Sequence, residues 1–196
     1  MLDVQVATLA NQAMNFFVSG KAPRRTGNAH PNIQPQDVFA CRDGEIVLAV
    51  GNDGQFAKLC EVLGRPELAR DERFAKNASR VRNLAVLRPL VAGILEAGDR
   101  SHWVAALDAA GVPAGPINAI PEVFEDAQVK HRRMLVDVPH PLAGTVPLVA
   151  SPMRFTAAPL VHDRAPPLLG EHTAEILRDI GIGDAEIEQL RKGGVV

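Results

Sequence analysis

The 196-residue sequence contains no Tyr, a single Trp and only 4% aromatic residues. Aromatic side chains provide the stacking surfaces of proteins that bind single-stranded nucleic acids. Its charges almost cancel, with 21 Lys and Arg against 23 Asp and Glu, so the composition gives no basic surface for a phosphate backbone or an anionic membrane. We therefore expect neither nucleic acid nor a membrane as a partner.

Cysteine and long apolar runs are also scarce. Cys41 and Cys60 lack CxxC spacing, so we expect two reduced thiols, with a disulfide or a metal pair as the alternative. No apolar run approaches the ~18 residues that a membrane-spanning helix needs. The apolar start carries Asp3 where a signal peptide would carry Lys or Arg. These features predict a cytoplasmic protein.

The sequence lacks the common motifs for metals, nucleotides and serine hydrolysis. It has no GxxxxGK[ST] or GxGxxG for a nucleotide and no GxSxG for a nucleophilic serine. The histidines form no HxxxH or HxH pair, whereas zinc sites need clustered ligands, so we expect no bound metal. The six are His30, His102, His131, His140, His162 and His172.

Hydrophobic residues make up 46% of the chain and charged residues 22%, which is typical of a globular protein. Helical and strand patterns alternate irregularly, so we predict a mixed α/β (α+β) fold. Pro89 is expected to start or kink a helix, and Ser101 to cap one. In the first part of the chain we predict a helix over 2–18, a loop over 19–35, a hairpin over 36–50 around Arg42-Asp43-Gly44 and a helix over 56–64 ended by Gly64. In the middle we predict helices within 77–110, an extended segment over 112–118 and helix over most of 121–134. The last part should form two strands around Gly144 within 134–155, a short helix over 171–180 and a second from an Asp cap at 184 to 192.

Two short segments could carry chemistry. In Gly51–Gln55 (GNDGQ), two glycines flank a polar pair between a predicted strand and a predicted helix. Glycines allow unusual backbone angles and expose amide groups, so the segment could hold an anion or close over a site. The alternative is an ordinary turn capped by Asp53. His30–Asn32 lies in the long loop, where a rigid surface turn is the simplest interpretation.

Asp3 stands out as an acid among the apolar residues of the first predicted helix. It is either the N-cap of that helix or a partly buried carboxylate with a chemical task. Arg24 and Arg25 could bind a carboxylate or a phosphate, or could form a solvated basic pair. Local sequence leaves these alternatives open.

Seven stretches, taken in order, resemble the family III CoA-transferases, which include formyl-CoA transferase, carnitine CoA-transferase and α-methylacyl-CoA racemase. Each stretch is weakly specific alone, but their common order along almost the whole chain is highly specific. The stretches are LDVQVA, GNAHPNI, GNDGQFAKLCEVLG, DERFAKNASRV, AAGVPAGPIN, HPLAGTVPLVASPMRF and PPLLGEHTAEIL.

The resemblance implies an enzyme that moves coenzyme A from an acyl-CoA donor to a carboxylic acid through an aspartyl-CoA thioester. CoA thioesters would be substrates, and no cofactor would be permanently bound. Asp3 matches the family's nucleophile, and Gly51, Asn52, Gly54 and Gln55 match a mobile loop that closes on the intermediate. The loop lacks a Glu that the racemases carry, which favours a transferase over the racemase or dehydratase branch. A dicarboxylic acceptor is suggested by Arg24, Arg25 and His30.

The resemblance also implies a fold with a Rossmann-like large domain, built from both chain ends, and a smaller central domain, in an interlocked homodimer. Residues 1–29 and 131–196 would belong to the large domain and residues 30–130 to the small one. Family members are about twice as long, so we expect a fragment that lacks the N-terminal, CoA-binding half and is inactive alone. The alternative is a non-catalytic truncated remnant or dimerisation module.

Overall fold

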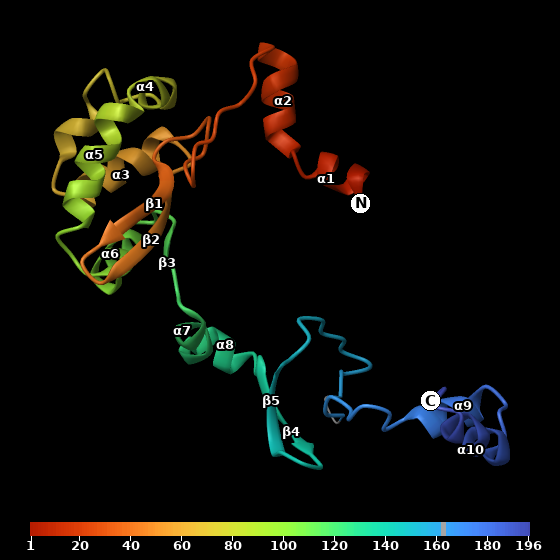
Figure 1. Cartoon of the computed structure of the whole chain (residues 1–196). Coiled ribbons are helices and arrows are strands. Elements are labelled where there is room, and N and C mark those ends of the chain that lie inside the picture. Colours follow the sequence, from red (N-terminus) through yellow and green to blue (C-terminus); the bar gives the residue numbers. More distant parts are fainter. Residues whose placement is uncertain (162–163) are drawn as a thin grey trace. The chain divides into compact units, whose positions relative to one another are not determined.

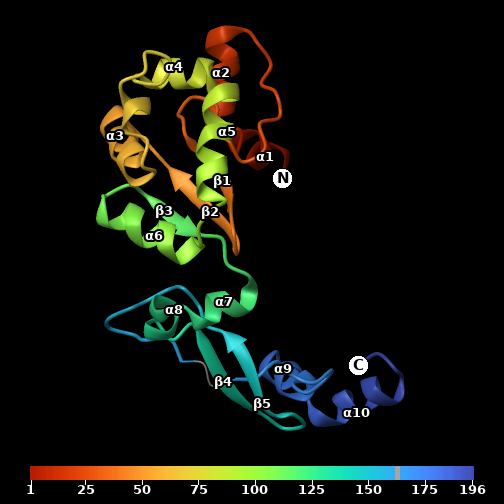
Figure 2. The ribbon, with the colours of Figure 1, turned by 90° about the vertical axis from the view of Figure 1, so that its left-hand side faces the viewer.

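The computed structural model describes residues 1–161 and 164–196 and divides into two compact units, Met1–Ile117 and Asn118–Val196. Figure 1 and Figure 2 show helices and small antiparallel sheets in a mixed α/β arrangement, as the sequence predicted. Of the histidines considered above, His162 lies outside the described residues. Among the described residues, no helix is both long enough and apolar enough to cross a membrane.

The first unit contains a three-stranded antiparallel sheet in the order β1 (Gln36–Cys41), β2 (Gly44–Ala49) and β3 (Ala114–Pro116). The two-residue connection Arg42-Asp43 brings Cys41 opposite Gly44, and Gly44 has a φ of 151°, which glycine adopts without strain. The predicted hairpin and the predicted extended segment are therefore both confirmed.

One face of this sheet forms the core of the first unit. Phe39 pairs with Ile46 across β1 and β2, and both are buried together with Leu48, whereas Val47 between them is 42% exposed. Successive side chains of a strand point to opposite faces, so this alternation places one face inside. Antiparallel sheets commonly bury one face and expose the other.

Helices cover the buried face of the sheet. Helix α5 (Leu84–Leu95) contacts β1, and α6 (Arg100–Ala109) contacts β2 and β3, an arrangement that can be followed in Figure 2. Three further elements complete the layer: α3 (Asp53–Val62), the 3-10 helix η1 (Pro66–Ala69) and α4 (Asn77–Arg82). Gly64, at a φ of 68°, follows α3 and ends it as predicted, because glycine readily adopts the left-handed conformation.

Two details of the predicted helical region 77–110 can be compared with the structure. Pro89 lies inside α5, so of the two alternatives it does not begin a helix, and a kink at Pro89 stays a prediction. The N-cap of α6 is Asp99 and not Ser101, and its side chain is bound to Arg42. The first free amide of α6, that of Arg100, instead donates to the Asp43 carboxylate at 2.7 Å. A side chain from the hairpin turn therefore does the capping that a local residue was expected to do.

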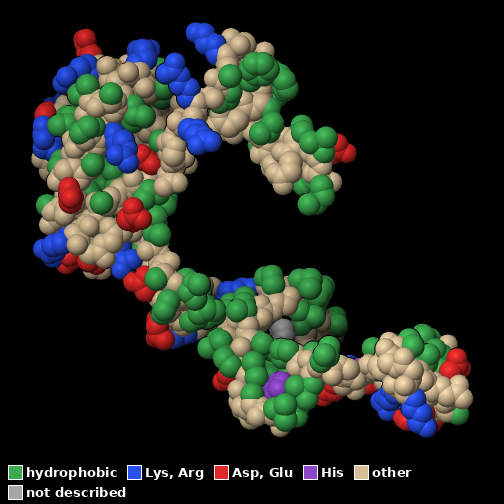
Figure 3. All heavy atoms as spheres, viewed as in Figure 1, with side chains coloured by type: hydrophobic (Ala, Val, Ile, Leu, Met, Phe, Trp, Pro, Cys, Tyr) green, Lys and Arg blue, Asp and Glu red, His purple; other side chains and the backbone are tan. Residues whose placement is uncertain are grey.

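The single helix predicted over 2–18 is in fact two, α1 (Leu2–Ala7) and α2 (Ala10–Ser19). The Thr8 hydroxyl donates back to the Gln5 carbonyl, and Ala10 has a left-handed φ of 44°, which breaks the ladder of helical hydrogen bonds. Neither helix contains a buried residue. Their exposed apolar side chains are visible in Figure 3.

The second unit is more open than the first. Its elements are α7 (Ile120–Glu125), α8 (Ala127–His131), the antiparallel hairpin of β4 (Leu135–His140) and β5 (Gly144–Val149), α9 (Thr173–Asp179) and α10 (Asp184–Lys192). The two strands around Gly144 are confirmed. Asp184 is the first residue of α10 and not its cap, which is Gly183. Among its described residues only Val138, Ala150 and Ile187 are buried apolar side chains.

The alternation in β2 gives a direct test of the core. Leu48 is fully buried and Val47 is 42% exposed, so we expect Leu48→Ala to lower the free energy of unfolding by about 2–5 kcal/mol. The adjacent control, Val47→Ala, should change it by no more than about 0.5 kcal/mol. Trp103 is buried in the same core, so urea unfolding followed by Trp fluorescence reports on this unit. Equal losses in the two variants would contradict the assignment of the faces.

Candidate functional site

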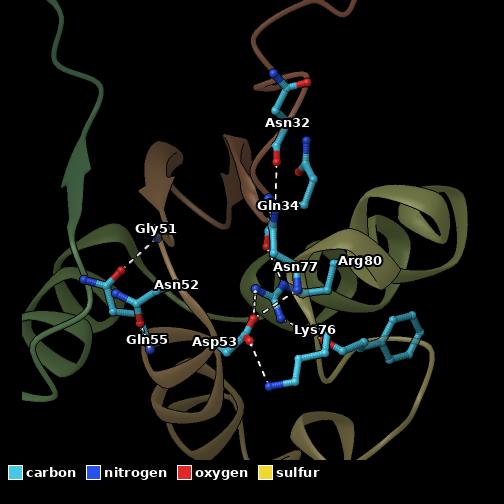
Figure 4. Close-up of polar contacts among 10 residues, drawn as sticks. Asn32, Gln34, Gly51, Asn52, Asp53, Gln55, Lys76, Asn77 and Arg80 are labelled. Atoms are coloured by element: carbon cyan, nitrogen blue, oxygen red, sulfur yellow. Dashed lines mark hydrogen bonds and ion pairs between the residues drawn. The ribbon is translucent and has the colours of Figure 1, made fainter.

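The segment Gly51–Gln55, here called the glycine loop, leads from β2 into α3 and is closed by its own side chains. Asn52 is the N-cap of α3, and its side-chain oxygen accepts the amide of Gln55 at 2.9 Å. The Gln55 side-chain oxygen accepts the amide of Gly51 at 2.7 Å. Figure 4 shows the two side chains side by side. This reciprocal pattern resembles a capping box, in which the N-cap and a side chain three residues later bind each other's backbone.

Neither glycine of the loop uses the left-handed backbone that glycine allows. A Cβ atom at Gly51 would lie 3.3 Å from the Gln55 side-chain oxygen, a close contact that this side chain would have to relieve by a small shift. A Cβ atom at Gly54 would lie 3.4 Å from the Asn52 oxygen, which is an ordinary van der Waals contact. The tighter position is therefore Gly51, whose amide takes part in one of the two hydrogen bonds.

The loop presents unused hydrogen-bond donors to solvent. Within the described part of the chain, the amides of Asn52, Asp53 and Gly54 donate to no acceptor, and Asn52 and Gly54 are exposed. The first amides of any helix lack partners inside that helix and lie at the positive end of its dipole. The loop can therefore donate to a negatively charged oxygen, provided that a substrate oxygen reaches it.

Asp53 does not cap α3, so the simple-turn alternative is wrong in that respect. Its Oδ1 accepts the Asn77 amide at 3.0 Å and pairs with Arg80 at 3.0 Å, and its Oδ2 lies 3.4 Å from Lys76. Burial of the carboxyl alone would raise its pKa, but the hydrogen bonds from Arg80 and Lys76, the charge of Arg80 and the Asn77 amide outweigh it. The pKa of Asp53 therefore lies below its ordinary value, and the group is ionised at neutral pH.

The partner of Asp53, Arg80, is completely buried. Its Nε donates to the Gln34 carbonyl at 2.6 Å, its Nη1 to the Phe74 carbonyl at 2.8 Å and its Nη2 to Asp53. Its guanidinium also lies 4.4 Å from the centre of the Phe56 ring. Burying a charge is unfavourable unless it is paired and hydrogen-bonded, and every nitrogen of this guanidinium has an acceptor.

The segment His30–Gln34, here called the histidine turn, also carries internal hydrogen bonds. The Nδ1 atom of His30 accepts the amides of Asn32 and Ile33, both at 3.1 Å. Because Nδ1 accepts these two amides, Nε2 is the ring nitrogen left to donate. His30 and Gln34 line an open pocket of about 480 Å³, together with Asp37 and Arg88, which are joined by an ion pair of 2.7 Å.

Asp3 is the second residue of α1 and is exposed. Met1 occupies the N-cap position, so the N-cap alternative for Asp3 is wrong. Among the described residues, no hydrogen bond or ion pair reaches the Asp3 carboxylate. Arg24 and Arg25 are exposed in the segment between α2 and β1. The structure thus joins the histidine turn to the glycine loop through α4, whereas no hydrogen bond or ion pair among the described residues joins the Asp3 or Arg25 side chain to either segment.

The described cysteines and histidines form no cluster that could bind a metal ion. Cys41 and Cys60 are buried free thiols, and burial raises the pKa of Cys60 to about 11, so its thiol stays protonated and unreactive. No group of three or more His, Cys, Asp or Glu side chains could hold a metal ion in the part of the chain that the structure describes.

Asn77 and Arg80, which connect the two segments, were not among the residues singled out from the sequence. Both lie in the stretch DERFAKNASRV, one helical turn apart. The burial of Arg80, in the last turn of α4, is a property of the folded chain that the sequence does not display. Arg80 was missed because a basic residue on a short helix usually faces solvent.

Comparisons with known proteins identify the family and support the fold described above. The sequence profile of "CoA-transferase family III" matches residues 1–173. The succinate–glutarate CoA-transferase of Agrobacterium fabrum is 43% identical over 92% of the chain, and the human succinyl-CoA:glutarate CoA-transferase is 35% identical over the whole chain. The crystal structure of a CaiB/BaiF family protein from Brucella suis superimposes on 89% of the chain with a TM-score of 0.74 and 46% identity.

The chain therefore belongs to CoA-transferase family III. This confirms the family and the fold class that the sequence predicted. The chain spans 45% of the length of each of the three relatives just described.

The ion pair at the glycine loop predicts a pH-dependent stability. Because the pKa of Asp53 is lower in the folded state than in the unfolded state, its carboxylate stabilises the fold above about pH 4, and this stabilisation is lost as the pH falls through the folded-state pKa. We expect Asp53→Asn to lower the free energy of unfolding by about 2 kcal/mol near neutral pH. At about pH 3 the unfolded chain already binds a proton at this carboxyl, which reduces the stabilisation, so the variant and the parent should differ less.

Urea unfolding at the two pH values measures both quantities. Asp99→Asn is the matched control, because the Asp99 side chain is as exposed as that of Asp53 but pairs with Arg42, which is 64% exposed, whereas Arg80 is buried. That control should show a smaller loss at neutral pH. An Asp53→Asn loss of the same size at both pH values would contradict the charge pairing.

Proposed function

We propose that this chain carries the nucleophile and the closing loop of an enzyme that transfers coenzyme A from an acyl-CoA to a carboxylic acid. The observation that carries the proposal is family membership over nearly the whole chain, with relatives named as CoA-transferases. The exposed amides of the glycine loop support it, because the reaction passes through negatively charged oxygens.

The proposed nucleophile is Asp3. Its carboxylate attacks the carbonyl carbon of the acyl-CoA, and the C–S bond breaks to give a mixed anhydride and the CoA thiolate. The thiolate then attacks the aspartyl carbonyl, which forms an aspartyl-CoA thioester and releases the donor acid. The acceptor carboxylate attacks this thioester, and the thiolate is expelled again as a second anhydride forms. Attack of the thiolate on the acceptor's acyl carbon yields the new acyl-CoA and restores Asp3.

Each of these attacks places a negative charge on a former carbonyl oxygen. We propose that the amides of Asn52, Asp53 and Gly54 donate to such an oxygen when the glycine loop closes. Exclusion of water is equally important, because water would hydrolyse the anhydride. The loop fits both tasks, since its glycines leave the amides uncovered and its side-chain hydrogen bonds can open and reform.

A dicarboxylic acid is the proposed acceptor, because both relatives described above are named for glutarate together with succinate or its thioester. The free Nε2 donor of His30 and the exposed guanidinium of Arg25 are candidates to bind the carboxylate distant from the reaction.

The proposal extends to the part of the relatives that this chain does not match, since the chain spans 45% of their length. We propose that the rest of the relatives' length supplies most of the CoA-binding groups and completes a large domain with residues 1–29 and 131–196, while residues 30–130 form the small domain. The exposed apolar side chains of α1 and α2 would then be covered by that domain or by a second subunit, which supports a homodimer.

The role of Asp3 predicts a loss of turnover on substitution. In the chain joined to the segment that completes its relatives, Asp3→Ala should abolish succinyl-CoA-dependent thioester exchange with glutarate. Asp184→Ala, at another exposed acid at the start of a helix, should leave the rate unchanged. The 196-residue chain alone should show no exchange. Turnover by the Asp3→Ala enzyme would remove Asp3 from the mechanism, and turnover by the chain alone would show that the additional segment is dispensable.

The two nitrogens of His30 can be separated by substitution. Asn at position 30 retains an acceptor near the Nδ1 position and removes the Nε2 donor, whereas Gln retains a donor near Nε2. We expect His30→Asn to raise the KM for glutarate about tenfold, because a hydrogen bond to a charged group is lost, with stability unchanged. His30→Gln should retain a lower KM but unfold more easily. A glutarate KM that is unchanged in both variants would contradict acceptor binding by His30.

A further inference from the structure

Helix α4 lies between the two segments that carry the proposed site residues. Asn77, its first residue, donates its side-chain nitrogen to the Asn32 carbonyl at 2.8 Å and accepts the Gln34 amide at 3.0 Å. Its own amide donates to Asp53 at 3.0 Å. One residue therefore contacts both the histidine turn and the glycine loop, as Figure 4 shows.

Arg80 repeats this bridge one helical turn further on and inside the core. Its guanidinium joins the Gln34 carbonyl of the histidine turn to the Asp53 carboxylate of the glycine loop. Arg80 is fully buried, whereas the Asp53 side chain is 40% exposed. The positive charge that binds the glycine loop therefore lies on a buried side chain, Arg80, and the loop residue that it binds, Asp53, lies at the surface.

We propose that Asn77 and Arg80 are positioning residues that hold the glycine loop and the histidine turn in one fixed relative geometry. The inference rests on the proposed function of those two segments in the transfer reaction, and it adds residues whose part is to set where the loop's donors lie. Neither residue needs to touch substrate, because each acts through Asp53 or through the backbone of residues 32–34.

This arrangement divides the glycine loop into a fixed part and a part that can open. The Asp53 carboxylate is held by three groups: the Arg80 guanidinium, the Lys76 ammonium and the Asn77 amide. Among the described residues, Gly51 and Asn52 carry no ion pair: their restraints are the two hydrogen bonds with Gln55 and the Asn52 carbonyl, which accepts the Phe56 amide at 3.1 Å. We therefore expect closure over an intermediate to displace Asp53 less than Gly51.

The shape of arginine is required for this role. The planar guanidinium presents donors in a fixed fork, so three acceptors on three different segments can be held at once. Lysine at position 80 would retain the charge but would reach fewer of the Gln34, Phe74 and Asp53 acceptors. Arg73 serves as the matched control. It also lies against an aromatic ring, that of Phe74, and pairs with an aspartate, Asp71, but among the described residues its hydrogen bonds and ion pair reach neither segment.

Amide hydrogen exchange in the 196-residue chain tests the coupling without catalysis. The Gln34 amide donates to Asn77 and not to Asp53. Asp53→Asn should nevertheless speed its hydrogen exchange by about tenfold or more, because the variant weakens the contacts by which Asn77 and Arg80 join the two segments. The amides of Phe39 and Ile46 in the sheet provide the reference for global opening, and Arg73→Gln should leave the Gln34 amide unchanged. Unchanged Gln34 exchange in Asp53→Asn, relative to the sheet amides, overturns the proposal.

Kinetics in the completed enzyme test the consequence for the reaction. Arg80→Lys and Asn77→Ala should lower kcat by about tenfold or more, because small displacements of catalytic groups are amplified in rate, while the KM for acyl-CoA changes by less than about threefold and Arg73→Gln behaves as the parent. If Arg80→Lys does not fold, Asn77→Ala decides this arm. If the parent enzyme shows no thioester exchange, the proposed function is refuted. Hydrogen exchange at the Gln34 amide then still tests whether Asn77 and Arg80 hold the two segments together. An active parent with an unchanged kcat in Asn77→Ala overturns the positioning role alone.

Discussion

Arg80 brings a full positive charge into a core from which water is excluded, and its three acceptors determine how the surrounding segments must lie. An unpaired charge in such a place would be strongly destabilising. The backbone of the histidine turn, the backbone at Phe74 and the carboxylate at the start of α3 must therefore converge on one side chain. The shape of the glycine loop, and with it the direction of its free amides, depends on that convergence.

The sequence predicted much of the first unit because its signals there are local. The alternation around Phe39 and Val47 and the glycine after α3 each predict an element from a few neighbouring residues. What failed depended on distant partners. The cap of α6 comes from Asp43 in the hairpin, and Asp53 binds α4 where a local cap was expected. Periodicity carries no information about such contacts between segments far apart in the chain.

In the candidate site, too, the sequence identified some residues and missed those whose role depends on distant partners. The resemblance identified Asp3 and the glycine loop, and local chemistry alone left both as ordinary helix starts. The role of Asn77 and Arg80 emerged only when the folded chain placed them between two loops. Asp3 itself has no contact among the described residues that would position it or tune its reactivity. In our account, those contacts come from the additional length that the relatives possess.

The central claim is that Asp3 becomes covalently bonded to coenzyme A or to the acyl group during the reaction. The direct measurement is mass spectrometry of the completed enzyme, quenched with hydroxylamine during turnover of succinyl-CoA and digested to peptides. The account predicts a hydroxamate on the peptide that contains Asp3 and on no other acidic residue, and its absence from the Asp3→Ala enzyme. An unmodified Asp3 during active turnover, or a hydroxamate at a different residue, would contradict it.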